Sequence, residues 1–568
     1  MFSKFSKAII MSATFPGEVG DRLLPSLVDH IATTDPGRVF CSFAKTKDPA
    51  DGFQDVTYPV FARAIDRFAW YLEDKLGRGE DFPTLLYMGP QDMLYAIVIL
   101  GTIKAGYKAL LNAPFDSLEA NLYLLEETDC HTFLFSKDLD YPMVKRIPEN
   151  REMRVFEIES LQYWLRDGEV PHYPFTKTFE EAKHEPFAVI HTSGSTSMPK
   201  PVVTTHATWI SGDMISNMAS PVPVAHQLLK SKRAYISFLA CHAAGISIMF
   251  AVGIYGDITT VMASWPATPE IVNSVITHGN IQAAYIVPSL LTRMFQIPEY
   301  VKNLSTLEHV IFAGGTIPES IGDQLSTMTH LVNGFGMTES GIVPTKCCGE
   351  KDWKYLQLAE ELGHEFRHAS DDLYELVIVR HKDPEKCKFQ GIFGTYPHFD
   401  VYETHDMFSK HPTTEGYWMY RGRSDDMIVL SNGRNINPVD VERTIGSHPI
   451  VNGVVVVGMT RPQLALLVEA NKPPANQEEK DSLIAELWST VEAANGPVQS
   501  FARIDRDMIV FTSAEKPMSR AGKGTVRRKM TVKLYEEELD RLYEAKEQKV
   551  AKGGDIHVNS TLISPWVQ

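Results

Sequence analysis

Apolar and polar positions change their spacing along the chain, and the first half shows helical stripes that alternate with short apolar runs. Near the start the pattern predicts a helix opened by Thr57 and Pro59 and closed by Gly77, a strand over Thr84–Met88, a buried helix over Gln91–Ala105 that stops at Gly106, and a strand over Tyr107–Leu111. The same alternation resumes from Val189 to about Leu331. Strands that alternate with helices in this way indicate βαβ units and a largely parallel sheet.

Beyond Asp425 the pattern changes to shorter units. Apolar runs over Met427–Leu430, Val451–Val457 and Leu464–Val468 are separated by turn residues, and Gln477–Ala494 is predicted as a helix. A last amphipathic stripe is formed by Val532, Tyr535, Leu539 and Leu542, and the polar segment Ala551–Gln568 follows it. This texture predicts a small α+β domain with a tail or linker.

Composition limits the possible partners. The chain has 568 residues, a formal net charge of −16 and 44% hydrophobic residues, so it can bury large cores but offers no global compensation for nucleic-acid phosphates. Its six cysteines are scattered without a C-x-x-C pair, which argues against a zinc site or disulfide framework and fits a reducing compartment. We therefore expect no nucleic-acid partner and a cytoplasmic location.

One segment is long and apolar enough to suggest a membrane span. Phe238–Gly256 carries no formal charge, but it contains His242 and several glycines and lacks a basic flank on its C-terminal side. Met1–Val19 has two lysines and only a broken apolar run, so we expect no signal peptide there, while a weak targeting function stays open. We predict a buried helix in this segment and no membrane association.

The stretch Ala188–Val202 is the first candidate for chemistry. An apolar run over Phe187–Ile190 predicts a strand, and the turn that follows gathers hydroxyls, a glycine and one ammonium: Thr192, Ser193, Gly194, Ser195, Thr196 and Lys200. Backbone amides, short hydroxyl donors and a lysine suit a polyphosphate. The run taken alone could also be a solvated turn, and it lacks the spacing of a Walker loop.

Six further motifs lie at Cys241–Gly245, Ala313–Thr316, Asn333–Glu339, Tyr402–Asp425, Asn432–Glu442 and Pro517–Lys523. Gly314 and Gly315 would let a flat ligand approach the backbone, although a tight turn explains them equally well. Glu339 offers the hard oxygen ligands that Mg²⁺ prefers.

In their order and spacing, these motifs resemble the signatures of the adenylate-forming superfamily, which holds acyl-CoA synthetases, luciferases and the adenylation domains of nonribosomal peptide synthetases. The chain departs from the usual pattern at Ser197, Pro201 and His405, where glycines are usual, and at Ser519, where threonine is usual. The Pro-Lys-Pro ending of the phosphate loop is similar to that of fungal peptide-synthetase-like carboxylic acid reductases.

The resemblance implies roles for named residues. Phe335 would stack on adenine, Thr338 would touch the α-phosphate, Glu339 would hold Mg²⁺, Asp406 would bind the ribose hydroxyls, Arg423 would support the ribose and phosphate region, and Lys523 would bridge the acid carboxylate and ATP. The nucleotide site would also include the phosphate-loop residues named above, Gly314, Gly315, Asn333, Gly334, Gly336 and Tyr420. Gly433 would let a pantetheine arm pass.

The resemblance also implies an acid pocket. His242 would gate it, although a buried structural histidine is an alternative, and its walls would be Tyr285, Ile311, Ala313, Gly334, Ile342 and Val343. None of these walls is charged, and an α-ammonium buried without a partner would be costly. We expect an acid without a free α-amine, first an aryl or arylalkyl carboxylate and second a short aliphatic one. Tyr285 leaves open a quaternary-ammonium acid held by a cation–π contact.

The implied fold is α/β, with a large domain of layered sheets and helices over residues 1–422, a hinge over 423–425 that includes Asp425, and a small mobile α+β domain over 426–548 that carries Lys523. Residues 549–568 would be a tail or a linker to a downstream carrier domain. The implied reaction uses ATP and Mg²⁺ to form an acyl-AMP from a small carboxylic acid, and the acceptor is the phosphopantetheine thiol of a carrier domain that this sequence does not contain. A free-standing acid–CoA ligase is the alternative, and a silent nucleotide-binding scaffold is the non-enzyme alternative.

Overall fold

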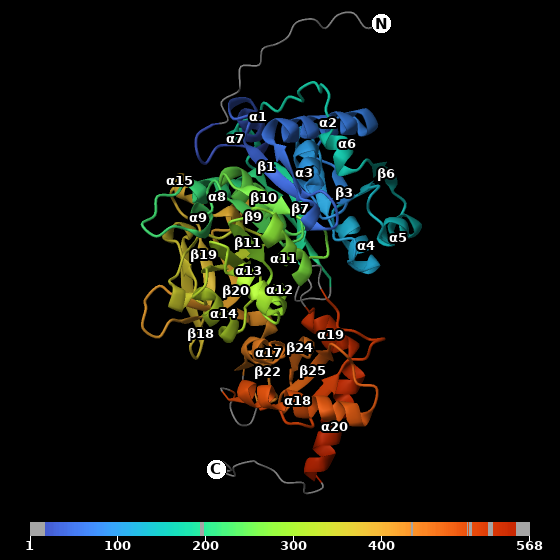
Figure 1. The fold of residues 1–568 in the computed structure, drawn as a ribbon, viewed down its shortest axis with the longest axis vertical. Coiled ribbons are helices and arrows are strands. Elements are labelled where there is room, and N and C mark those ends of the chain that lie inside the picture. The colour runs from blue at the N-terminus through green and yellow to red at the C-terminus, as the bar shows by residue number, and fades with distance from the viewer. Residues whose placement is uncertain are drawn as a thin grey trace, which may run out of the picture. The chain divides into compact units, whose positions relative to one another are not determined.

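The computed structural model describes residues 17–192, 198–432, 435–496, 498, 503–520 and 526–551. The chain divides into two compact units, and the main division falls inside strand β21 (Trp418–Arg423), between Tyr420 and Arg421. His405–Met407, in the middle of β20 (Val401–Lys410), group with the second unit. Figure 1 labels many of the elements of both units.

A six-stranded sheet forms the first layer of the large unit. Its strands lie in the order β6 (Arg154–Ile158), β5 (Thr132–Ser136), β3 (Thr84–Met88), β4 (Lys108–Leu111), β7 (Pro186–Thr192) and β8 (Lys200–Thr205). All neighbours are parallel except β8, which runs antiparallel to β7. The predicted strand at Thr84–Met88 and the largely parallel sheet are confirmed.

The helices of this half include the two that the apolar pattern predicts, over Tyr58–Leu76 and Leu94–Ala105, although the second begins at Leu94 rather than at Gln91. The described helices are α1 (Leu24–Thr34), α2 (Tyr58–Leu76), α3 (Leu94–Ala105), α4 (Leu118–Glu127), α5 (Met143–Asn150), α6 (Leu161–Leu165) and α7 (Phe179–Ala182). Thr57 does precede α2, but its hydroxyl makes no capping hydrogen bond. Gly106 ends α3 with a φ of 85°, a left-handed conformation that favours glycine. Helices α1, α2 and α6 lie together at one end of this unit (Figure 1).

A seven-stranded sheet forms the second layer. Its order is β13 (His330–Gly334), β12 (His309–Ala313), β11 (Ala283–Ile286), β9 (Arg233–Ile236), β10 (Thr259–Met262), β1 (Val39–Ala44) and β2 (Phe53–Thr57). All neighbours are parallel except β2 at one edge. The helices that accompany it are α8 (His206–Asn217), α9 (Ala225–Leu228), α11 (Pro269–His278), α12 (Pro288–Met294), α13 (Pro298–Leu304) and α14 (Glu319–Ser326).

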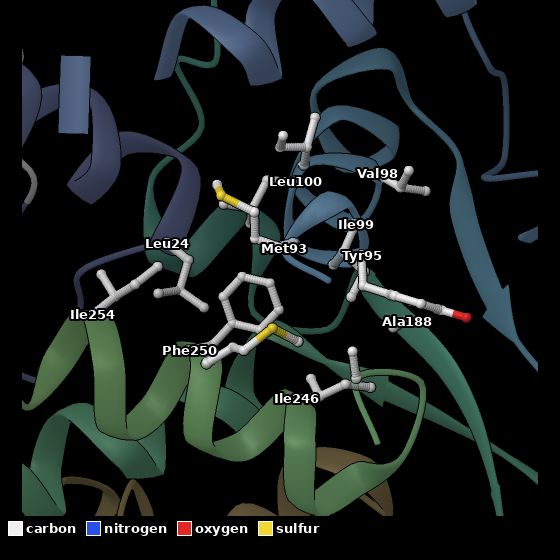
Figure 2. Close-up of a cluster of buried hydrophobic side chains, with 14 of the residues drawn as sticks. Leu24, Met93, Tyr95, Val98, Ile99, Leu100, Ala188, Ile246, Phe250 and Ile254 are labelled. Carbon is white, nitrogen blue, oxygen red and sulfur yellow. The ribbon is translucent and has the colours of Figure 1, made fainter. Parts of the chain in front are cut away.

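The segment Phe238–Gly256 is largely helical and buried, as predicted. It contains α10 (Ala243–Ser247), which continues as the π-helical segment η2 (Ile248–Tyr255). Figure 2 shows Phe250 and Ile254 of this segment meeting Leu24 of α1 and residues of α3, including Ile99. Within the described part of the chain, no helix combines the length and the apolar character needed to cross a bilayer.

Smaller elements complete the large unit. They are the paired strands β14 (Gly336–Met337) and β15 (Gly341–Ile342), the pair β16 (Thr345–Lys346) and β17 (Gln357–Leu358), the sheet β18 (His364–Ser370), β19 (Leu373–Val379), β20 and β21, and helices α15 (Pro384–Cys387) and α16 (Gly391–Thr395). Short 3₁₀ turns are η1 (Pro49–Asp51), η3 (Glu350–Asp352) and η4 (Glu360–Leu362).

The small unit is α+β, as predicted. Its strands are β22 (Ile428–Val429), β23 (Asn435–Ile436), β24 (Val451–Val457), β25 (Ala465–Ala470) and β26 (Ile509–Phe511), and its helices are α17 (Pro438–Gly446), α18 (Gln477–Asn495), α19 (Arg528–Leu534) and α20 (Glu536–Ala551). The last amphipathic stripe is divided between α19 and α20, because Tyr535 ends α19. The predicted tail lies outside the described residues beyond residue 551.

Candidate functional site

The predicted walls of the acid pocket lie on neighbouring strands near their carboxyl ends. Tyr285 of β11 is directly opposite Ile311 of β12, and Ala313 at the end of β12 is opposite Gly334 at the end of β13. Because these three strands are parallel, the residues gather at the carboxyl-terminal ends of the strands, on one side of the seven-stranded sheet. Tyr285 and Ile311 are buried, whereas Ala313 and Gly334 are half-buried. The edge of a parallel sheet beyond its carboxyl ends is the usual position of a ligand site in α/β folds.

A tight hairpin follows β13 and carries the predicted metal ligand. Gly336 of β14 pairs with Ile342 of β15, which leaves Thr338 and Glu339 in the turn. Gly341 has a φ of 69°, in the left-handed region where a side chain would be strained. Glu339 is half-buried. The burial of the Tyr396 phenol and the negative charge of Glu339 together raise the pKa of Tyr396 to about 12. Backbone geometry therefore fixes this turn.

His242 has a structural role at the start of α10. It is the residue before the helix, and its Nδ1 accepts a hydrogen bond from the backbone N–H of Ala244 at 3.4 Å. Gly245 is required nearby, since a Cβ there would lie 2.0 Å from the carbonyl oxygen of Leu239. His242 is half-buried rather than fully buried, so the buried structural histidine and the gating role both stay predictions.

The described ends of the predicted phosphate loop form a β-hairpin. Thr192, the last residue of β7, pairs with Lys200, the first residue of β8, and Lys200 is exposed. An antiparallel hairpin differs from the strand–loop–helix arrangement of a Walker loop. The predicted phosphate ligands Ser193, Gly194, Ser195 and Thr196 lie outside the described residues.

Aromatic rings surround the residue predicted to stack on adenine. The ring of Phe335 lies 5.6 Å from that of Phe408 and 6.1 Å from that of Tyr420, both measured between centroids. Phe335 stays half-buried, so part of its ring is accessible. Asn333, just before it, donates its side-chain amide to the carbonyl oxygen of Lys354 at 3.2 Å.

Gly314 and Gly315 follow β12, on the same edge of the sheet. Gly314 has a φ of 78°, and a Cβ added there would meet no atom within 4 Å. The turn therefore needs glycine for its backbone conformation and leaves open space at this position, as an approaching flat ligand would require. Both explanations of the glycine pair from the sequence remain compatible with the structure.

Arg423 interacts electrostatically with both the predicted ribose ligand and the predicted hinge residue. Asp406 is buried, and its carboxylate lies 4.0 Å from the guanidinium of Arg423, whose Nε donates to Asp425 at 3.0 Å. His405 has a φ of 62°, so it takes the left-handed conformation that explains why glycine is usual at this position in the pattern. Histidine in place of the usual glycine at position 405 therefore preserves the backbone conformation.

Lys523 itself lies outside the described residues, but the base of its loop is defined. Arg520 and Val526 form an antiparallel bridge on either side of it. Next to the bridge, the N–H of Arg527 donates to the carbonyl of Ser519 at 2.7 Å, and the N–H of Ser519 donates to Thr531 Oγ1 at 3.1 Å. Ser519, the substitute for threonine, thus anchors the loop through its backbone.

A partly buried ion cluster in the small unit was not predicted from the sequence. Arg528 of α19 donates to Glu442 of α17 at 2.6 Å and to the carbonyl of Val456 at 2.8 Å, and its Nε lies 3.9 Å from Asp426. Asp426 belongs to the 3₁₀ turn η5 (Ser424–Asp426), which also contains Asp425. Burial raises the pKa values of Asp426 and Glu442. Burial also opposes the charged form of Arg528, but the two carboxylates outweigh it and raise the pKa of Arg528.

A second buried cluster contains the described group that could hold a metal. Asp29, Asp66 and His172 place ligand atoms near one another. However, Nζ of buried Lys104 lies 2.8 Å from Asp29 and 2.7 Å from Asp66, so an ammonium already pairs with both carboxylates and compensates one of their two charges. The cluster joins α1, α2 and α3, which fits a structural role.

Comparison with known proteins gives consistent results. Residues 28–364 match the family described as AMP-binding enzyme, and residues 425–547 match the AMP-binding enzyme C-terminal domain. A carboxylic acid reductase of Neurospora crassa is 33% identical over 545 residues, covering 94% of this chain and 51% of the relative. The adenylate-forming reductase Nps11 of Serpula lacrymans is 27% identical, covering 96% of this chain and 51% of the relative. The chain thus spans about half the length of these relatives.

Among solved structures, a benzoate CoA ligase from Burkholderia xenovorans superposes with a TM-score of 0.66 at 18% identity, covering 90% of this chain and 99% of the ligase. At this identity the similarity establishes the fold, which is the predicted large domain of layered sheets and helices with a separate C-terminal domain.

Proposed function

The chain belongs to the AMP-binding family of adenylate-forming enzymes, and from that premise we propose which acid it activates and where the acyl group goes. The substrate is a carboxylic acid without a free α-amine, most simply an aryl or arylalkyl acid. The observation that carries this proposal is the uncharged set of residues at the ends of β11, β12 and β13, next to the turn with Thr338 and Glu339.

Charge decides between acid classes. An α-amino acid would bring an ammonium among Tyr285, Ile311 and Ala313, where none of the predicted walls offers a carboxylate. Burying that charge without a partner costs several kcal/mol, on the order of 2–5. A flat or compact apolar acid carries no such penalty, and its own carboxylate is neutralised at the nucleotide side.

The reaction needs no side-chain nucleophile. We propose that a carboxylate oxygen of the acid attacks the α-phosphorus of ATP, while the bond from that phosphorus to the bridging oxygen breaks and pyrophosphate leaves. Thr338 binds the α-phosphate, and Lys523 stays between the two anions as charge develops. The half-buried carboxylate of Glu339 fits a Mg²⁺ ligand, and that ion would neutralise phosphate charge when bound.

The nucleoside is assigned to the remaining motif residues. Phe335 stacks on the adenine, and Asp406 accepts hydrogen bonds from the ribose hydroxyls. Arg423 supports the ribose and phosphate region, which fits its 4.0 Å distance from Asp406. Residues 423–425 act as the hinge, and the small unit turns there between the two half-reactions.

We assign the acyl acceptor to the phosphopantetheine thiol of a carrier domain. Support comes from the relatives, which are about twice as long as this chain and include a protein named carboxylic acid reductase. Reduction of the thioester would then follow in the longer protein. A free-standing acid–CoA ligase is the alternative, and efficient acyl transfer to free CoA with none to any carrier would favour it. We keep the cytoplasm as the location, since the six cysteines, all described, are free thiols.

Pyrophosphate exchange into ATP tests the proposal. The enzyme is offered benzoate-like acids and short aliphatic acids alone, and then each acid in competition with α-amino acids of matched side chain. We expect exchange that depends on an acid lacking the α-amine. A clear preference for any α-amino acid contradicts the assignment of the acid class. If none of the acids supports exchange, a silent nucleotide-binding module is favoured instead.

A further inference from the structure

The hydroxyl of Tyr285 is a buried polar group that the fold leaves unsatisfied. The residue is 5% exposed, and among the described residues no donor or acceptor forms a hydrogen bond with its oxygen. Burial raises the pKa of this phenol above its usual value, so at neutral pH it is an intact O–H donor. A buried hydroxyl without a partner destabilises a protein, which makes such groups uncommon in native folds.

The described residues around Tyr285 are mainly apolar. Ile311 and Ile236 flank it on the neighbouring strands, and the thiol of Cys347, a weak hydrogen-bonding group, is the nearby titratable group. Ser237 is close in space, because its backbone N–H donates to the carbonyl oxygen of Tyr285 at 3.0 Å, and its hydroxyl accepts a hydrogen bond from the N–H of Val287 at 3.0 Å. The unsatisfied donor therefore belongs to the same uncharged set of residues that we assign to the acid.

The position of Tyr285 in the sheet determines where an acceptor for its hydroxyl would lie. Strand β12 separates β11 from β13, so Tyr285 stands two strand spacings, roughly 10 Å, from the strand that leads to Thr338 and Glu339. The reacting carboxylate must lie near Thr338, at the α-phosphate. A group that reaches Tyr285 is thus on the far end of the acid.

Building on the proposed function, we propose that Tyr285 donates a hydrogen bond to an acceptor atom on the acid, remote from its carboxylate. The substrate class is then an acid with a hydroxyl, ether, keto or ring-nitrogen acceptor, such as a ring-substituted aryl acid. Sites that hydrogen-bond a substrate group discriminate strongly against analogues that lack it, because the protein group is then left unpaired.

Matched pairs of acids test this inference. Hydroxy- or methoxy-substituted benzoates are compared with the methyl- or ethyl-substituted acids of similar shape, and ω-hydroxy aliphatic acids with their methyl counterparts, by kcat/KM in pyrophosphate exchange. In the wild type we expect the acceptor-bearing acid of the best pair to be preferred by on the order of 10-fold or more. Tyr285→Phe should remove most of that preference by slowing the polar acid, while the apolar acid reacts as well as before or better.

Tyr87→Phe is the matched control. The Tyr87 hydroxyl is also buried without a partner, but it lies on β3 of the six-stranded sheet and is not a predicted pocket residue. This variant should keep the wild-type preference, and both variants should melt within a few degrees of the wild type. Equal use of both members of every pair by the wild type, or an unchanged preference in Tyr285→Phe, would overturn the inference while exchange itself still supported the proposed function. Absence of exchange with every acid would instead refute the proposed function.

Discussion

The two units position their functional residues by different means. In the large unit, sheet register and glycine conformation hold the predicted site: Tyr285, Ile311 and Gly334 follow from strand pairing, and the turn with Glu339 depends on Gly341. In the small unit, a partly buried ion cluster contacts the turn next to the proposed hinge, through Arg528. The large unit should therefore be sensitive to added atoms, and the small unit to the removal of charge.

The largest effect is expected at Lys523, to which we assign a role in the chemistry rather than in the scaffold of the small unit. Lys523→Ala should lower the rate of adenylation by about 10²–10⁴-fold, because a charge used mainly in the transition state is lost. ATP binding, measured by calorimetry, should remain nearly unchanged, and transfer from pre-formed acyl-AMP should survive. Exchange of pyrophosphate at the wild-type rate would remove Lys523 from the mechanism.

Removal of the Arg528 guanidinium breaks the ion cluster of the small unit. Arg528→Met leaves the partly buried carboxylates of Glu442 and Asp426 without their cation, so the free energy of unfolding of this unit should fall by about 1–3 kcal/mol. Chemical denaturation followed by fluorescence measures this loss. The control is Arg541→Met, whose ion pair with Glu537 is exposed and should contribute less than about 1 kcal/mol. Equal effects of the two substitutions would contradict the role of the cluster.

A proline at the hinge should separate the two half-reactions. Asp425→Pro fixes φ within η5 and restricts Ser424, so thioester formation should fall on the order of 10²-fold while pyrophosphate exchange continues. Asp425→Asn serves as the control, because it weakens the contact with Arg423 without restricting the backbone. If both half-reactions fell equally in Asp425→Pro, Asp425 would not be the pivot.

Added atoms in the turn test the large unit. Gly341→Ala forces a side chain into a left-handed backbone, at a cost of about 1–2 kcal/mol that shifts Thr338 and Glu339. We expect a loss of exchange activity of roughly 10-fold. Gly349→Ala is the matched control: Gly349 has a φ of −69°, and a Cβ there would meet no atom within 4 Å. A similar loss in both variants would mean that turn geometry is not the reason.

The smallest effect concerns pH in the buried cluster of the large unit. A hydrogen bond to Asp66 raises the pKa of His172, although burial opposes it, and Asp29 and Lys104 complete its charged surroundings. The stabilisation by His172 is then fully present below the pKa of the unfolded chain, about 6.5, and is lost as pH rises through the higher folded pKa. His172→Asn should therefore cost more stability at pH 6 than at pH 8.5, by less than about 1 kcal/mol. The opposite order would contradict the assignment.

The sequence predicts local features well because they depend on short-range physics. The strand Thr84–Met88 and the helix ending at Gly106 follow from apolar spacing and glycine conformation over a few residues. The order of the motifs also predicts the family and its fold. Details of capping are less predictable: Thr57 precedes its helix without a capping hydrogen bond, and Tyr535 divides a stripe that looks continuous in the sequence.

Long-range pairings could not be predicted, because no pattern marks them in a single chain. Arg528 and Glu442 are separated by 86 positions, and Arg528 stands in an ordinary basic run. The unsatisfied hydroxyl of Tyr285 follows from what surrounds it in the fold, since a tyrosine on a buried strand normally finds a partner. Conversely, His405 looked like a departure from the family pattern, and its φ of 62° shows that it keeps the conformation of the usual glycine.

The most direct test of the central claim follows one oxygen atom. The wild-type enzyme is given ATP, Mg²⁺ and an acid without an α-amine whose carboxylate carries ¹⁸O, and hydroxylamine traps the activated acyl group. Attack of the carboxylate on the α-phosphorus predicts AMP that contains one ¹⁸O atom, together with unlabelled pyrophosphate. Label in inorganic phosphate with ADP as the other product, or unlabelled AMP, would contradict the account.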